Sequence, residues 1–272
     1  MDPTLNEWIN LALRWFHVFA GILWIGQTYF FAWLDAQLTE QENAARSPEA
    51  GKPGVWMVHS GGFYVVEKQK GAELQPRTLH WFKWEAALTW LSGMLLLGLI
   101  YHMGGLMVDP DSGVSVGRAA GIGTLAIILG WVVYDLLWIS PLGKSEMLGA
   151  LVCYGLLVAL TYGLTQVMSG RAAYMHIGAV IGTIMTANVW MRIIPAQRRM
   201  VAAVREGRAP DPKLAARAKQ RSRHNTFMVL PVVLIMISNH YPVATYGSSY
   251  NWLMLAALIL VGWAAAALIR RA

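Results

Sequence analysis

The stretch Leu11–Asp35, LALRWFHVFAGILWIGQTYFFAWLD, decides the fold class of this chain. About 20 apolar residues are enough for a helix to cross the hydrocarbon layer of a membrane, so the stretch predicts a membrane span. Its first turns nevertheless carry Arg14 and His17. Charged or ionisable side chains are costly inside lipid and usually face a partner, a cavity or a cofactor. These two residues therefore indicate that the span does more than anchor the chain.

Six more apolar runs follow, and the chain predicts an all-α fold, a polytopic transmembrane helical bundle with about seven spans. Apolar and aromatic residues make up 56% of the 272 residues and charged residues 14%. The runs are too long for strands and lack their alternation. We treat 1–272 as a single membrane-embedded helical domain. The predicted spans are residues 8–34, 81–103, 118–140, 147–168, 172–195, 226–242 and 251–269.

The positive charge of the chain lies mainly in one connection. Nine of the 22 lysines and arginines fall between Arg198 and Arg223, and the net charge is +7. The positive-inside rule places this connection in the cytoplasm. Alternation then places the N-terminus and the acidic turn at 109–113 in the periplasm, and the segment 36–79 and the C-terminus in the cytoplasm. The basic segment predicts contact with membrane lipid and not with nucleic acid. The N-terminus lacks the basic region of a signal peptide.

Three further features narrow the possibilities. Cys153 is the single cysteine, which excludes a disulfide frame, a zinc motif and a C-x-x-C-H site for covalent haem c. Within the segment 36–79, the piece VWMVHSGGFYVVEK at 55–68 is too apolar for a plain linker. We expect it to fold back against the bundle or to lie at the membrane interface. The segment 198–223 is expected to be an amphipathic basic helix or loop.

Four of the seven histidines are predicted at one depth, near the outer ends of four different spans: His17, His102, His176 and His240. A single histidine there is ordinarily an interfacial residue with its polar edge in water. Four of them at one level favour a cofactor, and neutral imidazole is the commonest axial ligand of haem iron. We therefore predict haem b, of unknown number, in the outer half.

The neighbours of His17 suggest how a haem would be held. Gly21 lies four residues on, on the same helical face, and leaves room for a flat macrocycle. Arg14 is placed to bind a haem propionate. We assign His17 and His240 as ligands of the haem iron, with His176 as the alternative ligand. Glycine in a membrane helix also serves close helix packing, so Gly21 alone does not decide between the two readings.

Polar residues also gather in the cytoplasmic halves of the spans. They are Glu85, Asp135, Asn188 and Arg192, accompanied on that side by His59, Lys83 and His224. Two interpretations stay open. The residues line a polar cavity that opens to the cytoplasm, or they form a structural network of interhelical bonds.

At these residues the sequence resembles the membrane domain of bacterial membrane-bound urate oxidase, also called urate hydroxylase. The resemblance runs in order from about residue 7 to residue 255. Its segments are LRWFHVFAGILWIG, VHSGGFY, WFKWEAALTWLSG, GWVVYDLLWISPLGK, IGTIMTANVWMRIIPAQR, DPKLAARAKQRSRHN and LPVVLIMISNHYP.

The resemblance implies an enzyme of purine catabolism in the bacterial cytoplasmic (inner) membrane. It implies oxidation of urate, or a related purine, to 5-hydroxyisourate, with electrons passed to a cytochrome c or the respiratory chain. The matching histidines are His17, His59, His224 and His240. We assign His59, Glu85 and His224 as catalytic residues lining the substrate cavity.

This chain departs from the family's usual pattern, in which a further membrane helix and a cytochrome c domain follow. We therefore expect a separate cytochrome c or a larger respiratory complex to take the electrons, and a homo-oligomer stays open. No flavin or molybdenum motif accounts for two-electron chemistry. The alternative function is a non-catalytic haem b subunit that transfers electrons within a respiratory complex. A transporter without redox cofactors fits the spans but leaves the histidines unexplained.

The predicted topology is testable by cysteine labelling in a Cys153→Ser background. A membrane-impermeant maleimide added from outside is expected to label Ser112→Cys, because the 109–113 turn is predicted to face the periplasm. It is not expected to label Ala209→Cys, in the basic connection, until the membrane is permeabilised. The reverse pattern would contradict the orientation.

Overall fold

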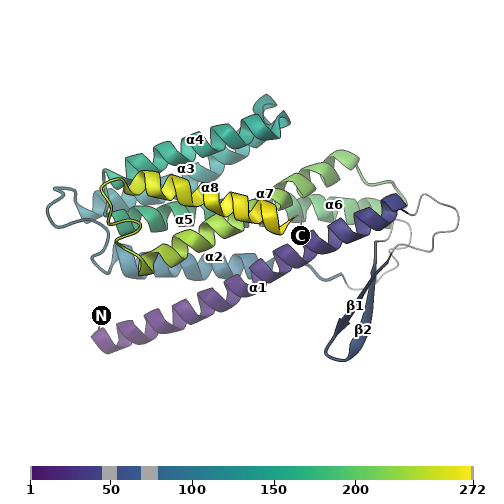
Figure 1. Ribbon diagram of the computed structural model, residues 1–272, viewed down its shortest axis with the longest axis horizontal. Helices are drawn as coiled ribbons and strands as arrows, with labels where there is room; N and C mark the ends of the chain where they lie inside the picture. Colours follow the sequence, from purple (N-terminus) through teal and green to yellow (C-terminus); the bar gives the residue numbers. More distant parts are fainter. Residues whose placement is uncertain (1, 45–53, 69–78, 271–272) are drawn as a thin grey trace.

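The computed structural model describes residues 2–44, 54–68 and 79–270 of the protein, and these form a membrane helical bundle (Figure 1). Six of the helical segments are long and apolar enough to cross a membrane, and they match six of the predicted spans. The elements are α1 (Pro3–Ala44), β1 (Gly54–His59), β2 (Gly62–Glu67), α2 (Trp84–Leu97), α3 (Val116–Ile139), α4 (Glu146–Thr165), α5 (Gly170–Ala187), α6 (Ile194–Arg205), α7 (Pro212–Ile237) and α8 (Asn251–Ile269).

The seventh predicted span, 226–242, corresponds to the apolar second half of α7 and the 3₁₀ turn η4 (Ser238–His240) that ends it. Two other helices carry π-helical turns, η1 (Gly98–His102) after α2 and η3 (Asn188–Ile193) between α5 and α6. Single π turns rotate the side chains that follow them and are frequent at functional sites. Both turns hold side chains discussed below.

Helix starts follow from the local sequence. Ser115, Ser145 and Ser169 are the N-caps of α3, α4 and α5, and each side chain accepts a hydrogen bond from a backbone N–H in the first turn. Asp211 caps α7 in the same way and is followed by a proline at the first helical position, where no N–H partner is needed. These caps fix the residue at which each of the four helices begins.

Helix α5 forms the centre of the bundle and packs against α2, α3, α4 and α7 (Figure 1). Nearly all of its residues from Ala172 to Ile181 are buried. Many of them are small, which lets neighbouring backbones approach closely in a membrane. The residues on α5 are therefore shielded from lipid on every side.

Helix α1 lies at the periphery, strongly tilted against α2 and α7 (Figure 1). Its 42 residues correspond to roughly 63 Å at 1.5 Å per residue, about twice the hydrocarbon thickness. The predicted span 8–34 is therefore only the middle of a longer helix. The tilt also means that residue number along α1 is a poor measure of depth.

The segment 36–79 contains a structure that the sequence did not predict. Residues up to Ala44 continue α1, and β1 and β2 form an antiparallel hairpin with Val55 opposite Val66. Val55 packs on Leu34 and Leu38 of α1, so the hairpin is attached to the last turns of this helix, and the rest of it projects away from the bundle (Figure 1). Residues 45–53 and 69–78 lie outside the described residues.

The basic segment 198–223 is two helix ends joined by a turn. Helix α6 ends at Arg205, Gly207 adopts φ 70°, and α7 begins at Pro212. The two helix ends pack against each other. We call the end of the bundle that carries this segment the basic end.

The crossing of α7 and α8 depends on a glycine. A Cβ on Gly262 would lie 2.7 Å from the backbone nitrogen of Pro231 and 2.9 Å from its Cα. We expect Gly262→Ala to lower the free energy of unfolding by about 1–3 kcal/mol, because a backbone neighbour cannot move aside. Thermal unfolding in detergent measures this. The control Gly155→Ala, whose Cβ would meet no atom within 4 Å, should leave stability unchanged or slightly raised.

Candidate functional site

A buried ion-pair cluster joins three elements near the basic end. Asp135 of α3 is 7% exposed and Arg221 of α7 is 4% exposed. Arg221 Nη2 donates to Asp135 Oδ1 at 2.9 Å, and Arg192 Nε from η3 donates to the same oxygen at 2.9 Å. Buried charges are tolerated only when they are paired, so this carboxylate holds two cations in place.

A hydrogen-bonded chain of neutral side chains adjoins this cluster. The Asn188 amide donates to the Tyr134 hydroxyl at 3.0 Å and to Asn225 Oδ1 at 2.9 Å. The Tyr134 hydroxyl lies 2.8 Å from His224 Nδ1. Tyr134 also lies under the guanidinium of Arg221, 4.9 Å from its ring centroid. The charged and neutral groups therefore form one network.

His224 joins the network through one ring nitrogen. Its Nδ1 lies 2.8 Å from the Tyr134 hydroxyl, whose oxygen also accepts from Asn188. In the tautomer in which Tyr134 donates this bond, Nε2 of the neutral imidazole carries the proton and presents an N–H donor at the far edge of the ring.

Several buried polar atoms here lack a hydrogen-bond partner. Of the five such side-chain atoms in the part of the chain that the structure describes, three belong to this region: Arg221 Nη1, Asn188 Oδ1 and Trp138 Nε1. An unpaired buried polar group costs about 1–3 kcal/mol. Native proteins rarely leave several together unless a ligand or ordered water completes them.

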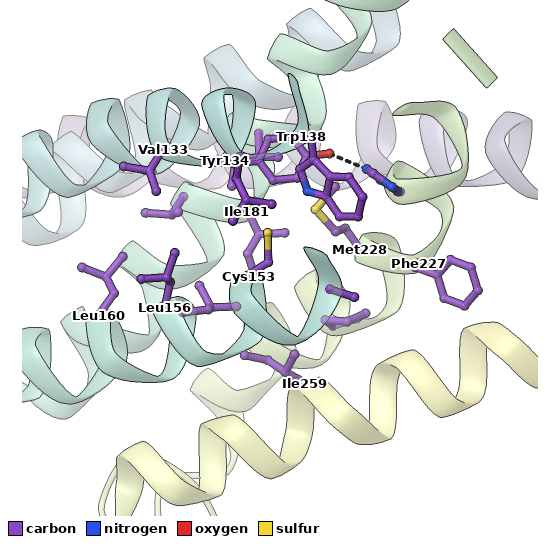
Figure 2. Close-up of a pocket in the computed structure, with 18 of the residues that line it drawn as sticks. Val133, Tyr134, Trp138, Cys153, Leu156, Leu160, Ile181, Phe227, Met228 and Ile259 are labelled. Carbon is purple, nitrogen blue, oxygen red and sulfur yellow. Dashed lines mark hydrogen bonds between the residues drawn. The ribbon is translucent and has the colours of Figure 1, made fainter. Parts of the chain in front are cut away.

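A cavity of about 580 Å³ opens beside the network, between α3, α4, α5, α7 and α8 (Figure 2). Tyr134, Trp138 and His224 line it near the basic end, where Arg223 and Glu146 form an ion pair. Most of the remaining lining is apolar. The dashed line in Figure 2 marks the hydrogen bond of Tyr134 to His224. This size is typical of small-molecule sites.

A second polar group, a pair of histidines, lies at the opposite end of the bundle. The rings of His102, from the π turn η1, and His176, from α5, are parallel within 3° with centroids 5.7 Å apart. His176 is fully buried, and Gly123 of α3 leaves space for its ring. The Nε2 atoms of both rings are buried without a partner.

The hydrogen bonds of His176 fix its tautomer. Its Nδ1 lies 2.8 Å from the carbonyl oxygen of Ala172, which can only accept. Nδ1 therefore carries the proton and Nε2 presents a lone pair. Metal-binding histidines commonly have this arrangement, with the second ring nitrogen held by a carbonyl.

His17 has the same arrangement but lies at another depth. Its Nδ1 is 2.9 Å from the Thr89 carbonyl and 3.0 Å from Ser92 Oγ, and its ring covers Gly93. Ser92 precedes His102 by ten residues, about 15 Å along the helix. The expectation that His17 shares the level of the other three histidines is therefore wrong, because α1 is tilted and longer than its apolar run.

The structure does not bring His17 and His240 together. His240 is exposed, and its neighbour Asn239 accepts hydrogen bonds from the Tyr101 hydroxyl at 3.3 Å and from Arg171 Nε at 2.9 Å. His240 therefore lies near Tyr101 of η1, nine residues beyond Ser92 on the same helical segment.

The other two residues assigned to the haem site also face elsewhere. Arg14 donates through Nε to Asn10 on its own helix, at 2.5 Å. Gly21 faces Thr89 of α2, and a Cβ there would make an ordinary contact at 3.9 Å.

The three residues assigned as catalytic are also separated. His59 is exposed at the end of the hairpin, which projects away from the bundle (Figure 1). Glu85 accepts a hydrogen bond from Gln27 of α1 at 3.2 Å. His224 faces α3 instead, so of the three only His224 belongs to the buried network.

The sequence interpretation missed Tyr134, Arg221 and Asn225. Two of them could have been predicted from their neighbours. Tyr134 is adjacent to Asp135, and Arg221 lies one helical turn before His224 on the same face of the helix.

Of the two interpretations left open, the interhelical network is the one that Asp135, Asn188 and Arg192 form. The cavity beside it is mainly apolar, and Tyr134 and His224 are the residues of the network that line it.

A comparison with protein families gives the chain a relationship. A family model described as "Urate oxidase N-terminal" matches residues 3–271. The chain belongs to this urate oxidase N-terminal family. The match covers the whole bundle, including the buried network and the histidine pair, so both are parts of the urate oxidase N-terminal domain. No curated protein and no solved structure gave a match.

The ion-pair cluster should control stability. Asp135→Asn is expected to lower the free energy of unfolding by about 3–5 kcal/mol, because it leaves the buried Arg221 without a compensating charge. Asp35 provides a matched control. It pairs with Lys68 at 3.2 Å and Lys219 at 2.7 Å near the surface, so Asp35→Asn should cost about 0–1 kcal/mol. Equal effects in thermal unfolding would contradict this difference.

Proposed function

We propose that the protein is the membrane component of a urate-oxidising redox system. It removes two electrons and two protons from urate while water supplies the new oxygen of 5-hydroxyisourate. The family relationship supports the substrate class. The observation that carries the proposal is the pair of unpartnered buried atoms, Arg221 Nη1 and Asn188 Oδ1, beside His224.

These groups complement a purine. Urate is flat and anionic, with carbonyl oxygens that accept hydrogen bonds and ring N–H groups that donate them. Arg221 Nη1 donates to a carbonyl and supplies positive charge, while Asn188 Oδ1 accepts from a ring N–H. The ion pairs of Arg221 with Asp135 keep this arrangement rigid before substrate arrives.

Haem b is part of the proposal, and His102 and His176 are its candidate ligands because the Nε2 atoms of both rings are unpartnered. The Ala172 carbonyl holds the Nδ1–H of His176, as in metal-binding histidines. Gly123 packs against the Nε2 edge of His176, so ligation requires this contact to open. When bound, haem supplies one-electron transfer. His17 has the same tautomer and is a further candidate ligand.

The remaining features follow from this arrangement. The basic end faces the cytoplasm of a bacterial inner membrane, so urate enters there. Electrons leave at the opposite end, near His102 and His176, to a cytochrome c or a respiratory complex. A second function, that of a haem b subunit that only relays electrons, is favoured by the same histidine pair. In this relay function Arg221 and Asn188 have no substrate to bind.

Urate reduction of the haem separates the two functions. Under anaerobic conditions, urate is expected to reduce the haem of the purified protein. His224→Gln should abolish this reduction, because the relay from Tyr134 and the Nε2–H donor are disturbed, while the haem absorbance stays. His59→Gln, on the exposed hairpin, is the control and should retain the wild-type rate. Visible spectra recorded after mixing measure both.

The haem assignment has its own test. His176→Ala and His102→Ala should each lower haem content or convert a low-spin spectrum to high-spin. Full haem content with an unchanged spectrum in both variants would contradict this ligand pair. A haem protein that dithionite reduces and urate does not would leave only the relay function.

A further inference from the structure

The cavity beside His224 is much longer than a purine. Its lining on α3 runs from Trp138 back to Ala126, and its lining on α4 runs from Glu146 to Leu160. At 1.5 Å per residue these stretches measure about 18 and 21 Å. Away from the basic end the lining is apolar (Figure 2). A small polar substrate leaves most of this space without a partner.

The cavity also reaches the lipid-facing surface. Leu129 of α3 and Leu156 of α4 both line it and are 46% and 47% exposed. In a membrane protein such exposed leucines face acyl chains. A ligand dissolved in the bilayer therefore has a route into the cavity between α3 and α4.

Polar donors are found at one end of this space. Trp138 is nine-tenths buried, and its Nε1–H lines the cavity end without a partner. His224 lines the same end, and its Nε2 is a donor in the tautomer in which Tyr134 donates to Nδ1. Two donors and a long apolar channel fit an amphiphile whose head carries hydrogen-bond acceptors.

The proposed reaction requires an acceptor of two electrons. The sequence contains no flavin or molybdenum motif, and a haem takes electrons one at a time. A quinone takes two electrons and two protons, its ring carbonyls accept hydrogen bonds, and its isoprenoid tail is apolar. It thereby satisfies the donors, the channel and the electron count together.

We propose that this cavity binds an isoprenoid quinone, with its head at Trp138 and His224 and its tail between α3 and α4. Resting on the proposed function, the bound quinone accepts the electrons of urate. In this step urate and water give 5-hydroxyisourate, two electrons and two protons, and the two quinone carbonyls become the hydroxyls of the quinol. Val180 and Ile181 of α5 also line the cavity, which places the quinone between the buried network and His176.

Cys153 provides a reporter of occupancy that does not depend on urate. It is the single cysteine of the chain, is partly buried and lines the cavity. The protein in phosphatidylcholine nanodiscs is labelled with N-ethylmaleimide with and without decylubiquinone. At a quinone concentration ten times Kd the labelling rate is expected to fall about 11-fold, because only the empty fraction reacts.

Matched variants test the head group. Trp138→Phe keeps an aromatic side chain but removes the five-membered ring with its N–H, and we expect quinone affinity to fall about 3- to 10-fold through the loss of one hydrogen bond. Trp131→Phe, on the same helix but outside the cavity lining, should protect Cys153 as the wild type does. The labelling rate without quinone shows whether each variant keeps the cavity.

The outcomes separate the two proposals. Unchanged labelling with decylubiquinone, or equal protection by decanol, would show that the cavity takes only lipid and would overturn the quinone site. Urate-dependent reduction of the haem alongside unprotected Cys153 would overturn this inference alone. Protection of Cys153 without formation of quinol from urate would uphold the binding site and remove its role in urate oxidation.

Discussion

A buried carboxylate holding two guanidinium groups organises the basic half of this bundle. Asp135 joins α3 to the π turn η3 through Arg192 and to α7 through Arg221. Arg192 is partly exposed and adds a second cation at the rim of the cluster. Asp135 and Arg221 are buried, and neither charge is stable there without the other, so α3 and α7 have one mutual position. That position places Tyr134, next to Asp135, within hydrogen-bond distance of His224. The polar wall of the cavity is thus a consequence of the ion pairs.

The central helix α5 has a polar residue near each of its ends. His176 lies in its second turn, and Asn188 follows its last residue in η3. Between them the helix is mostly apolar and mostly buried, and it contains no charged side chain that would stabilise a charged intermediate. Any transfer between the two ends through this region must be carried by electrons or by an apolar molecule. The cavity along α3 and α4 runs through the same interval.

The separation of polar groups into two ends of the bundle suits a membrane oxidoreductase of the urate oxidase N-terminal family. An ion-paired hydrogen-bond network lies in the basic half, whereas two histidines with unpartnered Nε2 atoms lie in the other half. His224 and His176 have different partners, a tyrosine hydroxyl and a backbone carbonyl. The carbonyl can only accept, so it holds the proton of His176 on Nδ1.

The sequence by itself determined the spans and the polar content of each half of the bundle. An apolar run of membrane length has only the helix as a satisfactory structure in lipid, because every backbone N–H must be paired within the segment. Asp135, Asn188 and Arg192 were placed in the same half for that reason, and the structure joins them in one network. The tertiary structure alone decided which histidines meet. Depth counted along one helix ignores tilt and helix extension, so His17 lies beside Ser92 while His102 pairs with His176. The hairpin at 54–67 was likewise not predicted from the sequence, because it is held by contacts with Leu34 and Leu38 of α1, which a strand pattern does not show.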